Sequence, residues 1–501
     1  MDLVSNLSLG LSVALQPINL MYCFIGTLLG TVIGVLPGIG PMATIAMLLP
    51  LTFGLEPTSS LIMLAGIYYG SQYGGSTTAI LLNLPGEASS AVTTIDGYQM
   101  ARKGRAGPAL AAAALSSFFA GTVATVLIAA VGGPLTAVAL SFGSAEFFSL
   151  LIVGLASSLA LASGSMVNAL AMICFGLLLG LTGTDVNTAK TRFTFGSMEL
   201  VDGLDFVAIA VGMFGVGEIL RNLETTGTRR PVIAKIGKIW PSAGDFRRMI
   251  GPAIRGTTIG SFLGILPGGG ALLSSFVAYN AEKKISRNSA EFGHGAIEGV
   301  VAPESANNAA AQTSFIPMLS LGLPSNVVMA LMIGAMIIQG IAPGPNVVTR
   351  NPDLFWGLIA SMWVGNGMLI ILNLPLIGIW MTLLRVPYTM LFPAIIAFCC
   401  IGVYSVGNSV FGVYVIGAAG LIGYFLVKVD CELAPFILGF ILGPLLEEYL
   451  RRSLVLSGGD LSVFVTRPIS AALLFVAAAM LIFAAVPMIS KKRQVVFVRG
   501  D

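Results

Sequence analysis

The chain has 501 residues, of which 56% are hydrophobic and only 10% are charged. Soluble domains carry roughly 25% charged residues, so this composition excludes an ordinary soluble protein and predicts one that is embedded in a lipid bilayer. The formal net charge of +3 is no evidence for a nucleic-acid partner, and we expect none; the five cysteines lack the spacing of a disulfide framework or a metal site.

Apolar runs long enough to cross a bilayer recur along the whole chain, which predicts an all-α polytopic membrane protein with about 10–12 transmembrane helices. Residues 1–16 contain no Lys or Arg ahead of the apolar part, so we expect no cleavable signal peptide. The segment 390–426 is long enough for two spans. The expected spans lie in segments 14–36, 58–82, 108–131, 135–162, 165–183, 205–220, 251–279, 313–341, 354–384, 390–426, 433–446 and 469–489.

A stretch of about 15 residues near the start of the chain occurs again 230 positions later. Residues 26–40 read GTLLGTVIGVLPGIG, and residues 256–270 read GTTIGSFLGILPGGG. Both copies are glycine-rich apolar helices that end in a Leu-Pro-Gly break. Two equivalent interrupted helices in a membrane protein indicate a transporter with its substrate site at a repeat interface. For a single copy, tight helix packing of small residues would be the simpler interpretation.

Each half carries a second break further along. Residues 83–87 read Asn-Leu-Pro-Gly-Glu after the polar run 68–78, and residues 322–326 read Gly-Leu-Pro-Ser-Asn after the polar run 303–314. Proline removes a backbone donor and glycine permits left-handed angles, so these sequences end helices inside the membrane. The freed backbone groups must face protein or a wet cavity, and helix N-termini there suit carboxylates. The helix-breaking prolines are Pro37, Pro85, Pro267 and Pro324.

The glycines and neutral polar side chains at these breaks are the candidate substrate-binding residues. Carbonyl and hydroxyl oxygens among them could also coordinate a coupling Na⁺; no other cofactor, catalytic group or metal cluster is expected. Glu87 and Glu304 flank the breaks, where a carboxylate is costly enough to suggest a function; a loop or helix-capping position is the alternative. The candidates are Gly38, Gly40, Ser71, Ser76, Thr77, Thr78, Asn83, Gly86, Gly268, Gly270, Asn307, Asn308, Gln312, Thr313, Ser325 and Asn326.

Basic residues predict the topology. The clusters at 102–105 and 221–255 should both be cytoplasmic by the positive-inside bias. The second copy of the repeat follows a basic segment directly, whereas nothing basic precedes the first, so we expect inverted, pseudo-symmetric repeats with broken or re-entrant helices. The expected units are an N-terminal repeat (1–220), a basic connecting loop (221–255) and a C-terminal repeat (256–501). The polar loop 183–196 should lie on the outer face, as a connector or a docking site for an external partner.

As a set, these motifs resemble the large membrane subunit of the tripartite tricarboxylate transporters, the TctA family. The residues that carry the resemblance are 34–41, 69–76, 83–87, 185–196, and 302–308 with 322–324. The resemblance implies a multi-pass protein of the bacterial inner membrane that imports tricarboxylates or related carboxylates, driven by a Na⁺ or H⁺ gradient. It also implies a small membrane partner subunit and a periplasmic solute-binding protein that delivers the substrate.

Three other functions remain as alternatives. An integral-membrane enzyme is disfavoured because the chain has no HExxH motif, no Cys/His cluster and a single histidine, His294, in a charged loop. A channel would show downhill flux without ion coupling. A purely structural scaffold would tolerate polar substitutions at the breaks, such as those at Asn83 or Asn308, without loss of uptake.

Overall fold

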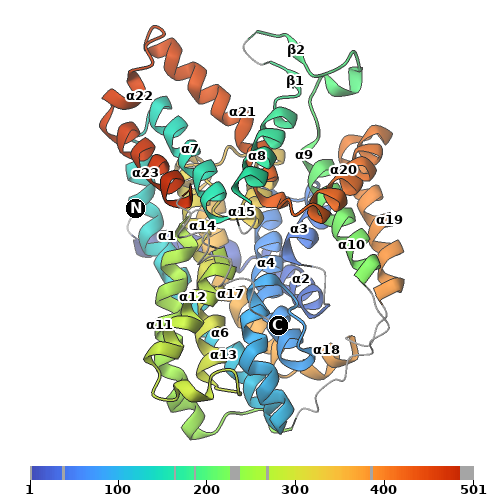
Figure 1. The fold of residues 1–501 in the computed structure, drawn as a ribbon, viewed down its shortest axis with the longest axis vertical. Coiled ribbons are helices and arrows are strands. Elements are labelled where there is room, and N and C mark those ends of the chain that lie inside the picture. The colour runs from blue at the N-terminus through green and yellow to red at the C-terminus, as the bar shows by residue number, and fades with distance from the viewer. Residues whose placement is uncertain are drawn as a thin grey trace.

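The computed structural model describes residues 3–36, 40–162, 165–185, 188–225, 237–266, 270–383 and 388–485. Figure 1 shows that nearly all of this chain is helical, as the apolar composition predicts. The described helices are α1 (Leu3–Ala14), α2 (Pro17–Val35), α3 (Pro41–Thr52), α4 (Pro57–Leu82), α5 (Ala91–Thr93), α6 (Ala106–Ala139), α7 (Ser144–Leu161), α8 (Met166–Gly180), α9 (Phe206–Ala210), α10 (Gly217–Thr225), α11 (Ala243–Ile265), α12 (Gly270–Ile285), α13 (Glu298–Thr313), α14 (Phe315–Leu321), α15 (Val327–Ile338), α16 (Asn346–Arg350), α17 (Pro352–Asn373), α18 (Ile377–Leu383), α19 (Tyr388–Gly407), α20 (Val410–Lys428), α21 (Leu433–Leu456), α22 (Val463–Thr466) and α23 (Pro468–Ala485).

Short irregular elements complete the described chain. Strands β1 (Gly183–Thr184) and β2 (Thr191–Arg192) pair antiparallel, with Gly183 opposite Arg192. Six short turns of tighter or wider helix are η1 (Ala88–Ser90), η2 (Thr94–Tyr98), η3 (Ala101–Arg105), η4 (Met198–Leu200), η5 (Val211–Val216) and η6 (Ser289–Glu291).

Within the described ranges, six helical stretches are long and apolar enough to cross a membrane without interruption. This is fewer than the expected spans, because Pro/Gly breaks divide several of them. The predicted span 251–279 separates into α11 and α12, and 313–341 into α14 and α15. At α6 an expected boundary is missing instead. This single helix of 34 residues continues through Pro134, across the gap expected between the spans 108–131 and 135–162. The segment 390–426 contains α19 and α20, so it is two helices.

The repeated glycines allow very close helix packing. On α2 and on α11, a Cβ atom added at any of three glycines would collide with the backbone of a neighbouring helix. The facing pairs on α2 and α4 are Gly26 with Met63, Gly30 with Ile67 and Gly34 with Ser71. The facing pairs on α11 and α13 are Gly256 with Ala302, Gly260 with Ala306 and Gly264 with Ala310. Residue numbers rise together in both sets, so each pair of helices is parallel.

The two pairs cross at the centre of the molecule and run in opposite directions. Near the start of their contact, the Tyr68 ring on α4 lies 6.5 Å from the ring of Phe315, which follows α13. Further along α4, Ser76 bonds to Glu304, which is near the start of α13. Because the numbers rise on α4 as they fall on α13, these helices are antiparallel. The long helices α6 and α17 pack across this centre, α6 on α13 and α17 on α4.

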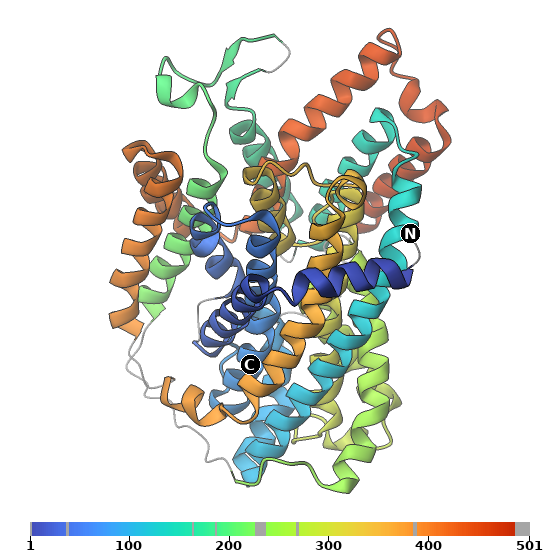
Figure 2. The same ribbon diagram turned by 180° about the vertical axis from the view of Figure 1, so that it is seen from behind.

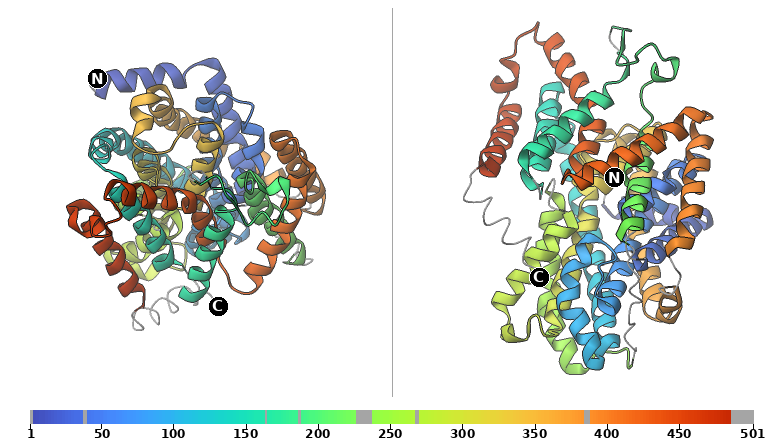
Figure 3. Two further views of the ribbon diagram at one scale, coloured as in Figure 1. Left: turned by 90° about the horizontal axis from the view of Figure 1, so that it is seen from above. Right: turned by 45° about the vertical axis from the view of Figure 1, so that its right-hand side comes forward.

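Basic residues mark one end of the molecule, at the bottom of Figure 1. There Arg105 pairs with Asp245 at 2.7 Å, and the Lys103 ammonium donates to the carbonyl oxygen of His294 at 2.5 Å. The β1–β2 hairpin lies at the opposite end. Seen from behind, α1 lies across the other helices (Figure 2) and packs on α17. From above, α19–α20 and α21–α23 lie on different sides of the central helices (Figure 3, left).

Candidate functional site

In each half, the second helix break lies beside a helix end that borders the first Leu-Pro-Gly sequence. In the first half, the Thr78 hydroxyl donates to the carbonyl oxygen of Val35 at 2.7 Å, and Gly86 lies directly against the carbonyl of Gly34. Therefore the break at 83–87 covers the end of α2. In the second half, a Cβ atom on Gly270 would lie 3.8 Å from the Cβ atom of Asn326, so the break at 322–326 adjoins the start of α12.

The second break has the same backbone course in both halves. The residue that ends the helix is left-handed in each case, Asn83 with φ 59° and Gly322 with φ 71°. Glycine and asparagine are the residues that adopt this conformation most readily. Four residues later the chain is extended, at Glu87 with φ −145° and at Asn326 with φ −155°, and a new helical turn begins. The equivalent residues of the second break are 239 positions apart in the two halves, whereas those of the first motif are 230 apart, so the second half has nine additional residues between its two breaks.

Glu304 lies at the centre, inside α13, and is completely buried. Its carboxylate accepts hydrogen bonds from Ser76 Oγ at 2.6 Å and from the hydroxyl of Thr93. Two longer contacts come from Asn307 Nδ2 at 3.4 Å and Ser117 Oγ at 3.5 Å. The three hydroxyls belong to the first half and the carboxylate to the second, so this cluster joins the two halves.

Side-chain amides on α13 continue the polar centre. Asn308 Nδ2 donates to Ser117 Oγ at 2.7 Å and to Asn307 Oδ1 at 2.6 Å. One turn further, Gln312 Oε1 accepts from the hydroxyl of Thr125 at 2.6 Å. Both contacts reach α6, so the second half's amides are held by hydroxyls of the first.

Glu87 is buried beside the break that precedes it. Its carboxylate accepts from Gln72 Nε2 at 2.8 Å and from the Ser89 hydroxyl, which also donates to Gln72 Oε1 at 2.8 Å. Glu87 also begins the turn that follows, with its N–H directed to Ser90 Oγ at 3.4 Å. Glu87 therefore occupies a helix-capping position, and its carboxylate is hydrogen-bonded within the first half.

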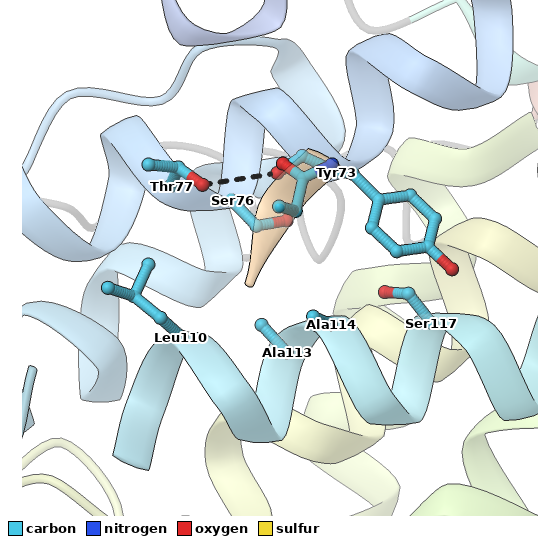
Figure 4. A pocket seen from close by; sticks show the side chains of 8 residues that line it. Tyr73, Ser76, Thr77, Leu110, Ala113, Ala114 and Ser117 are labelled. Carbon is cyan, nitrogen blue, oxygen red and sulfur yellow. Dashed lines mark hydrogen bonds between the residues drawn. The ribbon is translucent and has the colours of Figure 1, made fainter. Parts of the chain in front are cut away.

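Two aromatic side chains of α4 make further connections across the halves. The Tyr73 hydroxyl donates to Asn366 Oδ1 on α17 at 2.6 Å, and Asn326 Nδ2 lies 3.5 Å from the Tyr68 hydroxyl. Figure 4 shows a small pocket between α4 and α6, with Tyr73 and Ser117 directed toward each other across it. The pocket has room for about one water molecule.

The predicted residues take three kinds of position. Ser76, Asn308, Gln312 and Asn326 contact the other half of the chain, whereas Asn307 contacts Glu304 on its own helix. The hydroxyls of Ser71, Thr77 and Thr313 bond instead to carbonyls of their own helices, while Ser325 contacts the Ser314 carbonyl. Asn83 and Pro85 are exposed and Pro324 is buried, Gly40 precedes α3, and Pro37, Gly38, Pro267 and Gly268 lie outside the described residues.

Several central residues were absent from the predicted set. Thr93, Ser117, Thr125 and Asn366 reach the centre from α5, α6 and α17. In the sequence they are single polar residues in apolar or unremarkable surroundings, so spacing does not mark them. Gln72 belongs to the polar run 68–78 and could have been selected from that position alone.

The arrangement can bind a solute through hydroxyls, amides and backbone groups. In the described part of the chain, the ion pairs involve neither Glu87 nor Glu304. This part of the chain also has no group of three or more His, Cys, Asp or Glu residues that could hold a metal ion. The centre is therefore polar without a fixed positive charge.

Comparison with known proteins identifies the family. The family description "Tripartite tricarboxylate transporter TctA family" matches residues 20–438. A protein of Agrobacterium vitis, described as an uncharacterized 52.8 kDa protein in the TAR-I ttuC' 3' region, is 61% identical over 501 residues and is covered completely, as is this chain. A second Agrobacterium vitis protein, described as uncharacterized in the TAR-II ttuC' 3' region, is 61% identical over 242 residues, which is all of that protein and 48% of this chain.

No solved structure matches this chain. The family match spans both repeated motifs, all four helix breaks and the buried Glu304. The chain belongs to the TctA family of tripartite tricarboxylate transporters, as a multi-pass membrane subunit.

Proposed function

We propose that this subunit imports tricarboxylates or related carboxylates across the bacterial inner membrane, driven by a Na⁺ or H⁺ gradient. The observation that carries the proposal is the polar centre formed by Ser76, Ser117, Glu304 and Asn308, between two helix pairs that run in opposite directions. Such a site, near interrupted helices at a repeat interface, is typical of secondary transporters.

The matching packing of the two halves supports an inverted repeat. In both, three glycines of the first helix contact the backbone of a parallel helix, α4 or α13. A left-handed residue then precedes a Leu-Pro sequence, Asn83 directly after α4 and Gly322 after α14, the short helix that follows α13. Because α4 and α13 are antiparallel, the shared element has opposite orientations in the two halves. An inverted repeat explains how one fold can adopt two states that open to opposite sides of the membrane, because a pseudo-two-fold axis in the membrane plane relates the halves.

The small central pocket supports a mechanism that involves movement. A space for about one water molecule does not admit a tricarboxylate, so the substrate must bind in a conformation in which the halves are further apart. The interface is made of hydroxyl and amide hydrogen bonds, which can exchange partners with water or a carboxylate at a small net cost in free energy. We infer that the two halves separate around the polar centre to expose it to each side in turn.

Two partner proteins complete the proposed transporter, a small membrane subunit and a periplasmic binding protein that supplies the substrate. The 183–196 loop supports an outer docking position, because its hairpin lies at the end opposite η3 and the start of α11, and it holds Phe195 91% exposed. Binding of the purified partner to wild-type protein and to a Phe195→Ser variant would test this position.

Transport is tested by the uptake of radiolabelled citrate and a panel of other carboxylates into proteoliposomes that contain all three components. We expect accumulation that requires an inward Na⁺ or H⁺ gradient. Asn308→Ala removes the contacts to Ser117 and Asn307, and should lower uptake by roughly tenfold. Asn280→Ala, at an exposed position on α12, is the matched control and should leave uptake unchanged.

The same assay separates the alternatives. Flux that runs downhill and ignores the cation gradient would indicate a channel. Failure across the whole panel, with a folded and assembled complex, would exclude the carrier. Chemical conversion of the carboxylate would indicate an enzyme, and normal uptake by Asn308→Ala would move the substrate site away from α13.

A further inference from the structure

Buried carboxylates in the described chain fall into groups that differ in how their charge is balanced. Five of them pair with arginine at 2.6–2.7 Å, namely Glu146, Asp185, Asp245, Glu282 and Glu298. A sixth, Asp96, accepts three backbone N–H groups and a tyrosine hydroxyl. The remaining two are Glu87 and Glu304.

Glu304 is the more fully enclosed of these last two. It is completely buried, whereas Glu87 retains 7% exposure beside an exposed helix break. An isolated carboxylate in a low-dielectric interior is so unfavourable that it pairs with a cation or takes up a proton. Within the membrane, such a residue marks an ion or proton pathway by default.

The neighbours of Glu304 have the chemistry of a cation site. Ser76, Thr93 and Ser117 each place a hydroxyl oxygen at the carboxylate, and a hydroxyl can turn to offer its lone pairs instead of its proton. Hard cations prefer carboxylate, hydroxyl and carbonyl oxygens. The amide of Asn307 could likewise present its oxygen after rotation, since its position is set only by a 3.4 Å contact.

We propose that Glu304, with Ser76, Thr93 and Ser117, binds the cation whose gradient drives transport. This proposal rests on the proposed function and adds the position and ligands of the coupling site. A cation there contacts both halves at once, since the carboxylate is on α13 and the hydroxyls are on α4, α5 and α6. Its binding therefore favours the closed interface, and its release permits the halves to separate.

The cation is either Na⁺ or a proton, which share this site chemistry and differ in the assay. The first measurement is binding of radioactive Na⁺ to the purified full-length chain, without partners or substrate. The second is carboxylate uptake and carboxylate exchange in proteoliposomes with both partners. Exchange of internal for external carboxylate needs no net movement of the cation. Comparing exchange with uptake therefore separates a defect in cation coupling from a defect in substrate binding.

The variants are matched by position. Glu304→Gln removes the charge and keeps the shape, and should weaken Na⁺ binding by at least roughly tenfold. Thr93→Val and Ser117→Ala should each weaken it several-fold. Their controls, Thr94→Val and Ser116→Ala, alter neighbours whose hydroxyls bond only to carbonyls of their own segment, and should bind Na⁺ like the wild type.

Each result has a defined meaning. Saturable Na⁺ binding that Glu304→Gln loses and Ser116→Ala keeps supports a Na⁺ site. Absence of Na⁺ binding, together with uptake that a pH gradient drives in the wild type but not in Glu304→Gln, supports a proton site. If Glu304→Gln does not fold, the question is decided by comparing Thr93→Val with its control Thr94→Val, and Ser117→Ala with its control Ser116→Ala, in the same assays.

Two results overturn the proposal. One is gradient-driven accumulation by a folded Glu304→Gln variant at the wild-type level. The other is a wild-type chain with neither Na⁺ binding nor uptake driven by a pH gradient. Failure of the proposed function looks different: the wild type would move no carboxylate in any gradient, while Na⁺ binding that depends on Glu304 would persist.

Discussion

The two halves of this protein share a backbone arrangement but differ in the side chains placed on it. On α2 and α11, glycines at the same spacing allow a parallel helix to approach within backbone contact. At equivalent positions on the facing helices, Ala65 corresponds to Glu304 and Tyr73 to Gln312. The steric requirement is therefore common to both halves, whereas at these two positions the carboxylate of Glu304 and the amide of Gln312 belong to the second.

The long helices that follow the breaks show the same relation. α6 brings Ser117 to Glu304 and Asn308 on α13, and α17 brings Asn366 to Tyr73 on α4. Each half thus supplies a helix that completes the polar centre on the other half. The contacts are equivalent in place but not in chemistry, which indicates that the two halves have separate roles around one site.

The largest expected effect concerns a contact that only one half provides. Asp96 Oδ1 accepts from the N–H groups of Gly293, Gly295 and Ala296, just before α13, and Oδ2 accepts from Tyr279 OH. Asp96→Ala would leave these donors unpaired in a buried site and should destabilise the protein by roughly 3 kcal/mol. Thermal unfolding in detergent would measure the loss, and hydrogen exchange should rise at residues 293–296.

Asp202→Ala is the control for this prediction, because Asp202 is exposed. Unchanged hydrogen exchange at residues 293–296 in the Asp96 variant would show that the contact between the halves does not depend on this carboxylate.

The next effect tests whether the glycine contacts are equivalent. Gly30→Ala and Gly260→Ala place a methyl group against the carbonyls of Ile67 and Ala306. Each should destabilise the protein by about 1–3 kcal/mol, because the backbone cannot move away as a side chain would. Fluorescence-detected size-exclusion chromatography after heating would compare the two variants directly.

Gly133 and Gly367 have open space where the methyl group would be, so Gly133→Ala and Gly367→Ala should be neutral or slightly stabilising. If only one of the two repeat variants is destabilised, the halves are not equivalent in packing.

The smallest effect is pH-dependent and lies at the basic end. Burial alone would raise the pKa of Asp245, but hydrogen bonds from Arg105 and Ser242 outweigh it and lower the pKa below its ordinary value of 3.8. A lowered pKa in the folded state stabilises the protein above the ordinary value, and the contribution disappears as the pH falls through the folded-state pKa. Since the Arg105 side chain is 40% exposed, the pair should contribute less than about 1 kcal/mol.

Thermal unfolding of wild type and Arg105→Gln at pH 7 and near pH 3 would measure this contribution. The difference between them should be present at pH 7 and shrink at the lower pH. Arg102→Gln, on the same segment, is the control. A difference that grows on acidification would mean that Arg105 acts through another group.

Much of the fold follows from sequence patterns whose causes are local. Apolar length predicts the helices, and Pro85 and Pro324 end them at the expected places because proline lacks an N–H donor. The exact division into spans was less predictable, since α6 continues through Pro134 to Ala139. The breaks at 37–39 and 267–269 lie outside the described residues.

The candidate site was only partly predictable, since hydrogen-bond partners depend on where distant helices meet. Motif residues such as Ser76 and Asn308 do contact the polar centre, whereas Ser71 and Thr313 bond to their own helices. A hydroxyl on a helix can always satisfy itself at the carbonyl one turn back, and its sequence position does not show which choice it makes.

The sequence by itself determined the membrane setting, the glycine-rich helices and the family, because these depend on composition and on residues close together in the chain. Only the tertiary structure decided that Glu304 receives hydroxyls from α4, α5 and α6, and that arginine balances the charge of five other buried carboxylates but not that of Glu304. The physical reason is that charge balance in a low-dielectric interior is set by all neighbours in space, and those neighbours come from segments up to 228 residues apart.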